Sequence, residues 1–194
     1  MSAERTDVLC AGILVADLFV PPLPRLPEPG ELQKVGPMLL ATGGCAFNAA
    51  MDLVRLGLRV GVAGPVGRDL FGEFIRRDLA GRGLADTSGL REVADAPTSQ
   101  TVILPVTGQD RRFIHSVGAN AAFRVSDIDR GTLTRARVLY VGGYGILPGF
   151  DPAELGDLFA FARSKGVRTV LDVAGVAAGS GPAMLAPVLP HVDA

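Results

Sequence analysis

The feature that most constrains the fold of this chain is an alternation of short apolar runs with segments of helical spacing. Residues 8–15 form a nearly continuous apolar run, as expected for a strand that is covered on both faces. The runs at 138–143 and 169–173 have the same character. Because segments with helical spacing separate such runs, we expect a parallel sheet with helices on both of its faces.

The helical segments carry recognisable boundary signals. Apolar residues recur at helical spacing over 46–54, and Gly57 then supplies a natural stop. Asp69 can cap a second helix, and Asp151 followed by Pro152 is typical of the start of a third. These signals place helices between the apolar runs and leave no evidence of a second independent domain.

Two regions interrupt the alternation. Residues 21–40 are rich in proline at first and then extended, and residues 100–106 and 112–117 have the pattern of a β-hairpin. From the residues alone, the hairpin is either an ordinary pair of edge strands or part of a lid over a site.

A pair of glycines, Gly43 and Gly44, leads directly into the first expected helix. Adjacent glycines let a ligand approach the backbone closely, and a helix start offers N–H donors without partners. Asn48, one turn inside the helix, can both donate and accept, which suits a substrate that bears hydroxyl groups. The alternative reading of the same glycines is a tight strand-to-helix turn without a ligand.

Asp17 is the sharpest single candidate for a binding residue. We interpret it as the end of the first strand, and ligands of open α/β sheets bind beyond the carboxyl ends of the strands. An ionised carboxylate can accept hydrogen bonds from two neighbouring hydroxyls at once. The alternative is a carboxylate that only caps the strand end.

Composition excludes several classes of function. The 194 residues are 48% hydrophobic and carry a net charge of −1, which gives no electrostatic case for nucleic acid or for an acidic membrane surface. No signal-peptide core precedes the first strand and no apolar run is long enough to span a bilayer, so we expect a cytoplasmic protein. His115 and His191 lie in unrelated segments, which gives little support for a metal site.

The two cysteines lie in unrelated settings and imply no disulfide framework. Cys10 falls in the first apolar run, and we expect a small core residue there. Cys45 begins a helix, so it is either a modestly reactive thiol or a position that only requires a small side chain.

Five segments of the chain, in the same order, resemble the ribokinase-like, or PfkB-type, carbohydrate kinases. The first three are an apolar strand that runs to an aspartate (8–17), the Gly-Gly-x-x-x-Asn segment (43–48) and a strand–turn–helix with G–x–V–G–x–D–x–F–G-like spacing (62–72). The other two are a Pro-Thr pair (97–98) and a Gly-Ala-Asn segment (118–120). The resemblance implies an α/β three-layer αβα sandwich with a central, mostly parallel sheet. It also implies a single but incomplete domain over 1–194, with a small β-lid from about 18–42 and 98–117.

The same resemblance implies ATP-dependent phosphorylation of a hydroxyl on a sugar or nucleoside, with Mg²⁺ on the nucleotide. Asp17 matches the family aspartate that accepts hydrogen bonds from two sugar hydroxyls. The backbone of Gly43 and Gly44 and the Asn48 side chain complete that surface. The lid of such proteins often also serves for dimerisation, so a homodimer through the lid is an expected arrangement.

Two family motifs do not occur in the 194 residues. They are an Asn-x-x-Glu motif and a later D-T-x-G-A-G-D-like motif, whose glycines form an anion hole and whose last aspartate is the catalytic base. We therefore expect the base beyond Ala194, assign no catalytic or metal-binding residue and no residue to ATP or Mg²⁺, and expect this chain alone to be inactive. The alternatives are a non-catalytic sugar-binding sensor and one half of a split kinase.

Two further parts of the sequence leave the identity of the substrate open. Residues 142–145 offer no acid where ribokinase-type members have one. Tyr144 either contacts a sugar ring or belongs to the wall of the fold, and Asn120 either sits at the rim of the site or is a turn residue. The sequence therefore predicts a hydroxyl-bearing substrate without naming the sugar.

Overall fold

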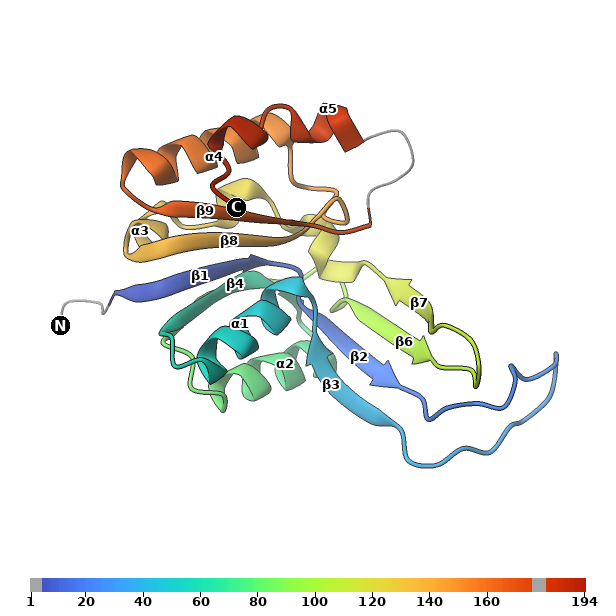
Figure 1. Cartoon of the computed structure of the whole chain (residues 1–194). Helices are drawn as coiled ribbons and strands as arrows, with labels where there is room; N and C mark the ends of the chain where they lie inside the picture. Colours follow the sequence, from blue (N-terminus) through green and yellow to red (C-terminus); the bar gives the residue numbers. More distant parts are fainter. Residues whose placement is uncertain (1–4, 176–180) are drawn as a thin grey trace.

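A computed structural model of the chain describes residues 5–175 and 181–194. Its central sheet holds five parallel strands in the order β5-β4-β1-β8-β9 (Figure 1). Their bounds are β1 (Thr6–Gly12), β4 (Val60–Gly67), β5 (Asp86–Val93), β8 (Ala136–Tyr144) and β9 (Arg168–Val173). The sequence pattern indicated each of these strands except β5, whose mixed polar residues hide it.

Helices cover both faces of this sheet, which confirms the expected three layers. Figure 1 shows α1 and α2 on one face and α4 and α5 on the other, with α3 beside β8. The bounds are α1 (Cys45–Arg55), α2 (Leu70–Ala80), α3 (Arg130–Thr134), α4 (Pro152–Ser164) and α5 (Gly181–Leu185). Three short 3₁₀ helices complete the described chain: η1 (Gly118–Ala122), η2 (Val125–Asp127) and η3 (Leu189–His191).

The central strand β1 divides the apolar core into two clusters. Leu9 and Ala11 pack on the side of α4, whereas Val8 and Cys10 pack on the side of α1 and α2. This alternation follows from the period of two in a strand, which sends successive side chains to opposite faces. Cys10 is fully buried, and burial raises the pKa of its thiol to about 12, so the expectation of a core cysteine is confirmed.

The helix boundaries follow the signals in the sequence. Asp69 caps α2 by accepting a hydrogen bond from the N–H of Gly72 at 2.8 Å. The same carboxylate accepts from the N–H of Thr98 at 2.8 Å and from its hydroxyl at 2.6 Å, which ties the start of α2 to the entry of the hairpin. Asp151 caps α4 by accepting from the N–H of Ala153 and Glu154. None of the helices in the described ranges is both long and apolar enough to cross a membrane.

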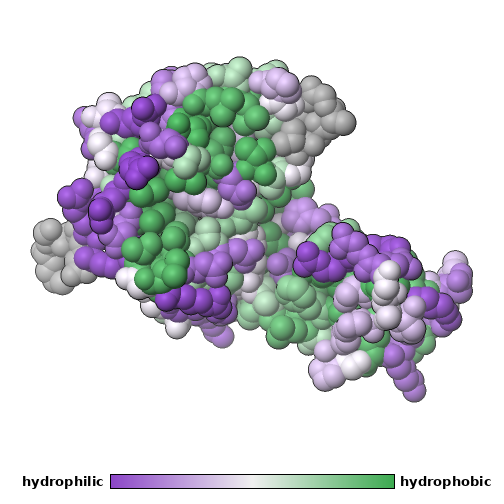
Figure 2. All heavy atoms as spheres, viewed as in Figure 1, coloured by the Kyte–Doolittle hydropathy of each residue, from purple (hydrophilic) through white to green (hydrophobic). Residues whose placement is uncertain are grey.

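A second sheet, which we call the lid sheet, projects from the body of the molecule (Figures 1 and 2). It has the order β3-β2-β6-β7, with β2 parallel to β6 and antiparallel to β3. Its bounds are β2 (Val15–Phe19), β3 (Leu39–Gly43), β6 (Gln100–Leu104) and β7 (Arg112–Ser116). The pair β6 and β7 is antiparallel, so the predicted hairpin is confirmed.

The first strand is shorter than the sequence suggests, and the expectation that Asp17 ends it was wrong. The chain leaves the central sheet after Gly12, crosses at residues 13–14 and enters the lid sheet at Val15, so that Asp17 lies within β2. Asn120 holds this crossing: its Oδ1 accepts from the N–H of Leu14 at 3.3 Å and its Nδ2 donates to the C=O of Leu14 at 2.9 Å. Because a buried backbone needs partners, this amide replaces the ladder that the crossing interrupts.

Candidate functional site

Asp17 lies against the backbone of Gly43 on the lid sheet. A Cβ built on Gly43 would sit 1.9 Å from Oδ2 of Asp17, so the carboxylate occupies the space that any side chain at 43 would need. Gly43 is the last residue of β3 and stands directly before the turn into α1. The first glycine of the pair therefore brings the carboxylate to the start of this helix.

Gly44 serves the turn itself. It is the N-cap residue of α1 with φ +98°, a conformation that side chains rarely adopt, and a Cβ there would meet the C=O oxygen of Ile13 at 2.4 Å. No side chain caps this helix. The N–H groups of its first turn are consequently available as donors next to Asp17.

Asn48 lies one turn into α1, on the side away from the core. The buried residues of α1 are Ala46, Phe47, Ala50 and Met51, whereas Asn48 is exposed. Within the described chain its amide has no hydrogen-bond partner, so both its donor and its acceptor are free for a ligand. The structure thus brings Asp17 against Gly43, with Gly44 next in the chain, and places Asn48 on the helix that the two glycines introduce.

Two residues beside Asp17, which are Thr101 and His115, were not predicted from the sequence. Burial raises the pKa of Asp17 above its usual value, while a hydrogen bond from Thr101 and the charge of His115 act in the opposite direction. The sequence offered one usable signal, because the predicted hairpin places Thr101 and His115 on its two strands. Their position beside Asp17 depends on the pairing of β2 with β6, which the sequence did not reveal.

A second polar group lies near the start of α1, on the carboxyl half of β8 and β9. The hydroxyl of Tyr140 donates to Oδ2 of Asp172 at 2.9 Å. A Cβ on Gly142 would meet the Tyr140 ring at 2.6 Å and the Cβ of Cys45 at 2.9 Å, so Cys45 belongs to the same group. Burial, with a further contribution from Asp172, raises the pKa of the Cys45 thiol to about 12, which favours the reading of a small residue over that of a reactive thiol.

Tyr144 and Asn120 have structural roles. Tyr144 is 1% exposed and its hydroxyl donates to the C=O of Met184 at 2.7 Å, so it is a wall residue of the core. Asn120 is also 1% exposed, with both ends of its amide bound to Leu14. Neither side chain is available to a ligand.

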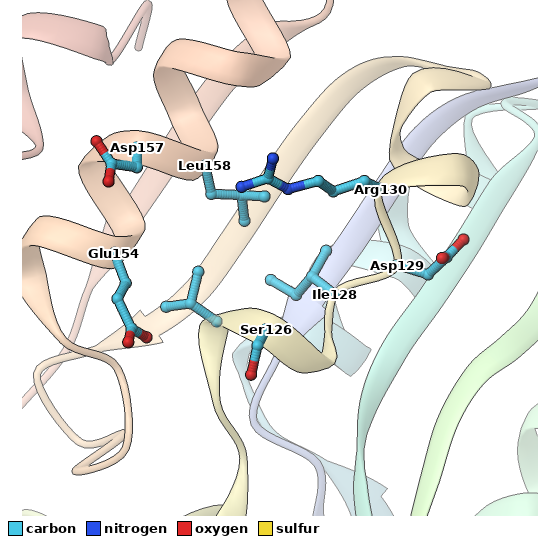
Figure 3. A pocket seen from close by; sticks show the side chains of 8 residues that line it. Ser126, Ile128, Asp129, Arg130, Glu154, Asp157 and Leu158 are labelled. Atoms are coloured by element: carbon cyan, nitrogen blue, oxygen red, sulfur yellow. The ribbon is translucent and has the colours of Figure 1, made fainter.

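A separate hollow of about 430 Å³ lies between η2, α3 and α4, on the face of the central sheet opposite α1 (Figure 3). Glu154 and Asp157 of α4 and Arg130 of α3 line it, and the guanidinium of Arg130 lies 4.6 Å from the ring centre of Phe161. None of the binding residues expected from the sequence lines this hollow. In residues 5–175 and 181–194, no group of three His, Cys, Asp or Glu side chains is placed to hold a metal ion.

Comparison with known proteins identifies the family. The model of the pfkB family carbohydrate kinases matches residues 5–193. The bifunctional protein HldE of Geobacter sulfurreducens is 32% identical over 139 residues, which cover 68% of this chain and 28% of that protein. A nucleoside kinase of Methanothermobacter thermautotrophicus is 26% identical over 185 residues, covering 88% of this chain and 58% of the kinase.

The fold matches solved structures of ribokinases and fructokinases. The structure of Arabidopsis thaliana ribokinase complexed with ribose and ATP matches with a TM-score of 0.74 at 24% identity, covering 89% of this chain and 55% of the ribokinase. The present chain thus spans between about a quarter and three fifths of the length of these relatives. The match of the family model over almost the whole chain, together with the fold, shows that this protein belongs to the pfkB family of carbohydrate kinases.

Proposed function

We propose that this chain binds the substrate of an ATP-dependent kinase that phosphorylates a hydroxyl group of a sugar or nucleoside. The observation that carries the proposal is the contact between the Asp17 carboxylate and the backbone of Gly43, directly before the uncapped start of α1. This contact places an acceptor of two hydrogen bonds beside a set of backbone donors. Vicinal hydroxyls, which both donate and accept, complement such a surface.

Each of the proposed binding residues has a distinct task. The carboxylate of Asp17 accepts hydrogen bonds from neighbouring hydroxyls and so fixes the orientation of the ring. The N–H groups that follow Gly43 and Gly44 donate to a substrate oxygen, and the Asn48 amide supplies one further donor or acceptor. Because hydroxyl groups form these hydrogen bonds and C–H groups do not, the arrangement selects a polyhydroxylated substrate over an apolar one.

In such kinases ATP supplies the phosphoryl group, and Mg²⁺ neutralises the charge of the phosphates. The described residues hold no acidic cluster of the kind that binds Mg²⁺. We therefore assign neither ATP nor Mg²⁺ to a residue of this chain, and we expect the 194-residue protein to bind a substrate without phosphorylating it. Substantial Mg²⁺-dependent release of ADP by the purified chain in the presence of a sugar would contradict this part of the proposal.

Calorimetric titration with D-ribose, D-fructose and adenosine tests the binding site. We expect at least one of them to bind, and Asp17→Asn to weaken that binding by about tenfold or more, the effect of losing a hydrogen bond to a charged group. Asn48→Ala should also weaken binding. Asp110→Asn, at the exposed turn between β6 and β7 of the lid sheet, is the matched control and should bind as the wild type does. Equal affinities for the wild type and Asp17→Asn would overturn the assignment of the site.

We further propose that the lid sheet joins two copies of the chain. Leu39, Phe113 and Ile114 are 62%, 57% and 63% exposed, and apolar surface on the projecting arm is visible in Figure 2. Covering such side chains favours association. Light scattering after gel filtration should give the mass of a dimer for the wild type and of a monomer for Ile114→Asp; a monomeric wild type would rule the arrangement out.

A further inference from the structure

Three side chains form a row across the lid sheet. Asp17 of β2 is the register partner of Thr101 of β6, and Thr101 is the register partner of His115 of β7. Register partners point to the same face of a sheet, so the three side chains share one face of the neighbouring strands β2, β6 and β7. Figure 1 shows these three strands in the lid sheet.

Thr101 lies between a carboxylate and an imidazole. Its hydroxyl is 3.0 Å from Nδ1 of His115, and its register places it beside Asp17, whose ionised form a hydrogen bond from Thr101 favours. A hydroxyl carries one proton and an ionised carboxylate can only accept, so Thr101 is the donor toward Asp17. When Thr101 donates in this direction, its oxygen is left to accept from Nδ1 of His115.

Thr101 and His115 offset the free-energy cost of burying the ionised carboxylate of Asp17. Asp17 is half-buried, and burial alone favours its neutral form. The hydrogen bond from Thr101 and the positive charge of His115 both favour the ionised form. From β3, only the uncharged residues Ala41 and Gly43 face Asp17, so within the described chain His115 is the charged group that acts on it.

We propose that Thr101 and His115 are positioning residues that keep the Asp17 carboxylate ionised and oriented toward substrate hydroxyls. This inference rests on the proposed function, because it takes Asp17 to be the residue that binds the substrate. Thr101 is only 8% exposed, and its hydroxyl lies between the two neighbouring side chains. His115 is exposed on β7.

The row predicts a particular dependence of binding on pH. Protonation of Asp17 at low pH removes its acceptor function, so affinity falls as the solution becomes more acidic. Removing the Thr101 hydroxyl or the His115 charge raises the pKa of Asp17, and the loss of affinity then begins at a higher pH. At a pH well above this range, Asp17 is ionised in all variants and the difference between them becomes smaller.

Two measurements on the 194-residue protein separate this inference from the proposed function. The first follows the ¹³C chemical shift of the Asp17 carboxyl against pH in the absence of any ligand. We expect a higher pKa of Asp17 in Thr101→Val and in His115→Asn, a value near the wild type in Thr101→Ser, and no change in the control His191→Asn. An Asp17 titration that is the same in all variants would overturn the inference, whatever the protein binds.

The second measurement is the affinity for D-ribose and for adenosine between acidic and neutral pH. For a probe that binds, Thr101→Val should weaken binding at the acidic end by about tenfold more than at neutral pH, and Thr101→Ser should restore the wild-type profile. A uniform loss at every pH would overturn the positioning role, because a merely structural defect acts in that way. If neither probe binds the wild type, the proposed function loses its support. The titration of the Asp17 carboxyl then still decides whether Thr101 and His115 favour its ionised form.

Discussion

Replacing Asn120 by alanine should destabilise the protein more than the loss of an ordinary surface amide. The side chain is 1% exposed, and it satisfies both the N–H and the C=O of Leu14, a residue 106 positions away, where the chain crosses from the central sheet to the lid sheet. In Asn120→Ala both backbone groups stay buried without a partner. Each such group costs about 1–3 kcal/mol, so for the two groups we expect a loss of roughly 2–6 kcal/mol in the free energy of unfolding.

Urea titration followed by far-UV circular dichroism measures this loss, since the chain contains no tryptophan to report by fluorescence. Asn120→Asp is the informative companion, because it keeps the size and one acceptor but places a carboxylate oxygen against the C=O of Leu14. We expect it to be at least as unstable as Asn120→Ala. Asn48→Ala, an exposed amide on α1, should remain within about 0.5 kcal/mol of the wild type. If Asn120→Ala also lowered the free energy of unfolding by no more than about 0.5 kcal/mol, the reasoning would be refuted.

Three further predictions follow from the caps, the turn and the thiols. Hydrogen bonds hold the pKa of Asp69 below its usual value of 3.8 despite partial burial. The stabilisation by Asp69 is therefore present above that pH and is lost as the pH falls through the pKa of the folded protein. In urea titrations, the difference in the free energy of unfolding between the wild type and Asp69→Asn should shrink on acidification. Gly44→Ala should lower the melting temperature strongly, because the turn needs a positive φ and the new Cβ would meet a backbone oxygen, whereas Gly83→Ala, with positive φ but open space around it, should cost less. Cys10 and Cys45 have pKa values raised to about 12, so both should react slowly with iodoacetamide at pH 8 until the protein is unfolded; rapid labelling of the native protein would contradict this.

The sequence predicted most of the central sheet and its helices because their signals are local. The caps at Asp69 and Asp151 and the apolar runs of β8 and β9 depend only on neighbouring residues. Strand β5 was missed, because it lies at the edge of the sheet and its residues are only partly buried, so no continuous apolar run marks it.

The crossing between the two sheets could not be predicted in the same way. Residues 8–15 are uniformly apolar, and nothing within this run shows that its two ends belong to different sheets. The break depends on Asn120, a partner 106 positions further along the chain. For the same reason the candidate site was predicted only in part: Asp17, Gly43 and Asn48 lie in recognisable segments, whereas Thr101 and His115 join them through the pairing of β2 with β6.

The close approach of Asp17 to Gly43 has a consequence for the evolution of this family. A side chain at 43 would occupy the position that Oδ2 of Asp17 now holds, so the carboxylate would have to turn away from the start of α1. A mutation at 43 alone therefore displaces the Asp17 carboxylate, and a shorter residue at 17 alone leaves an empty volume. Among homologues the two positions should vary together, with a larger residue at 43 only where a shorter one stands at 17, so that the pair is inherited as a unit.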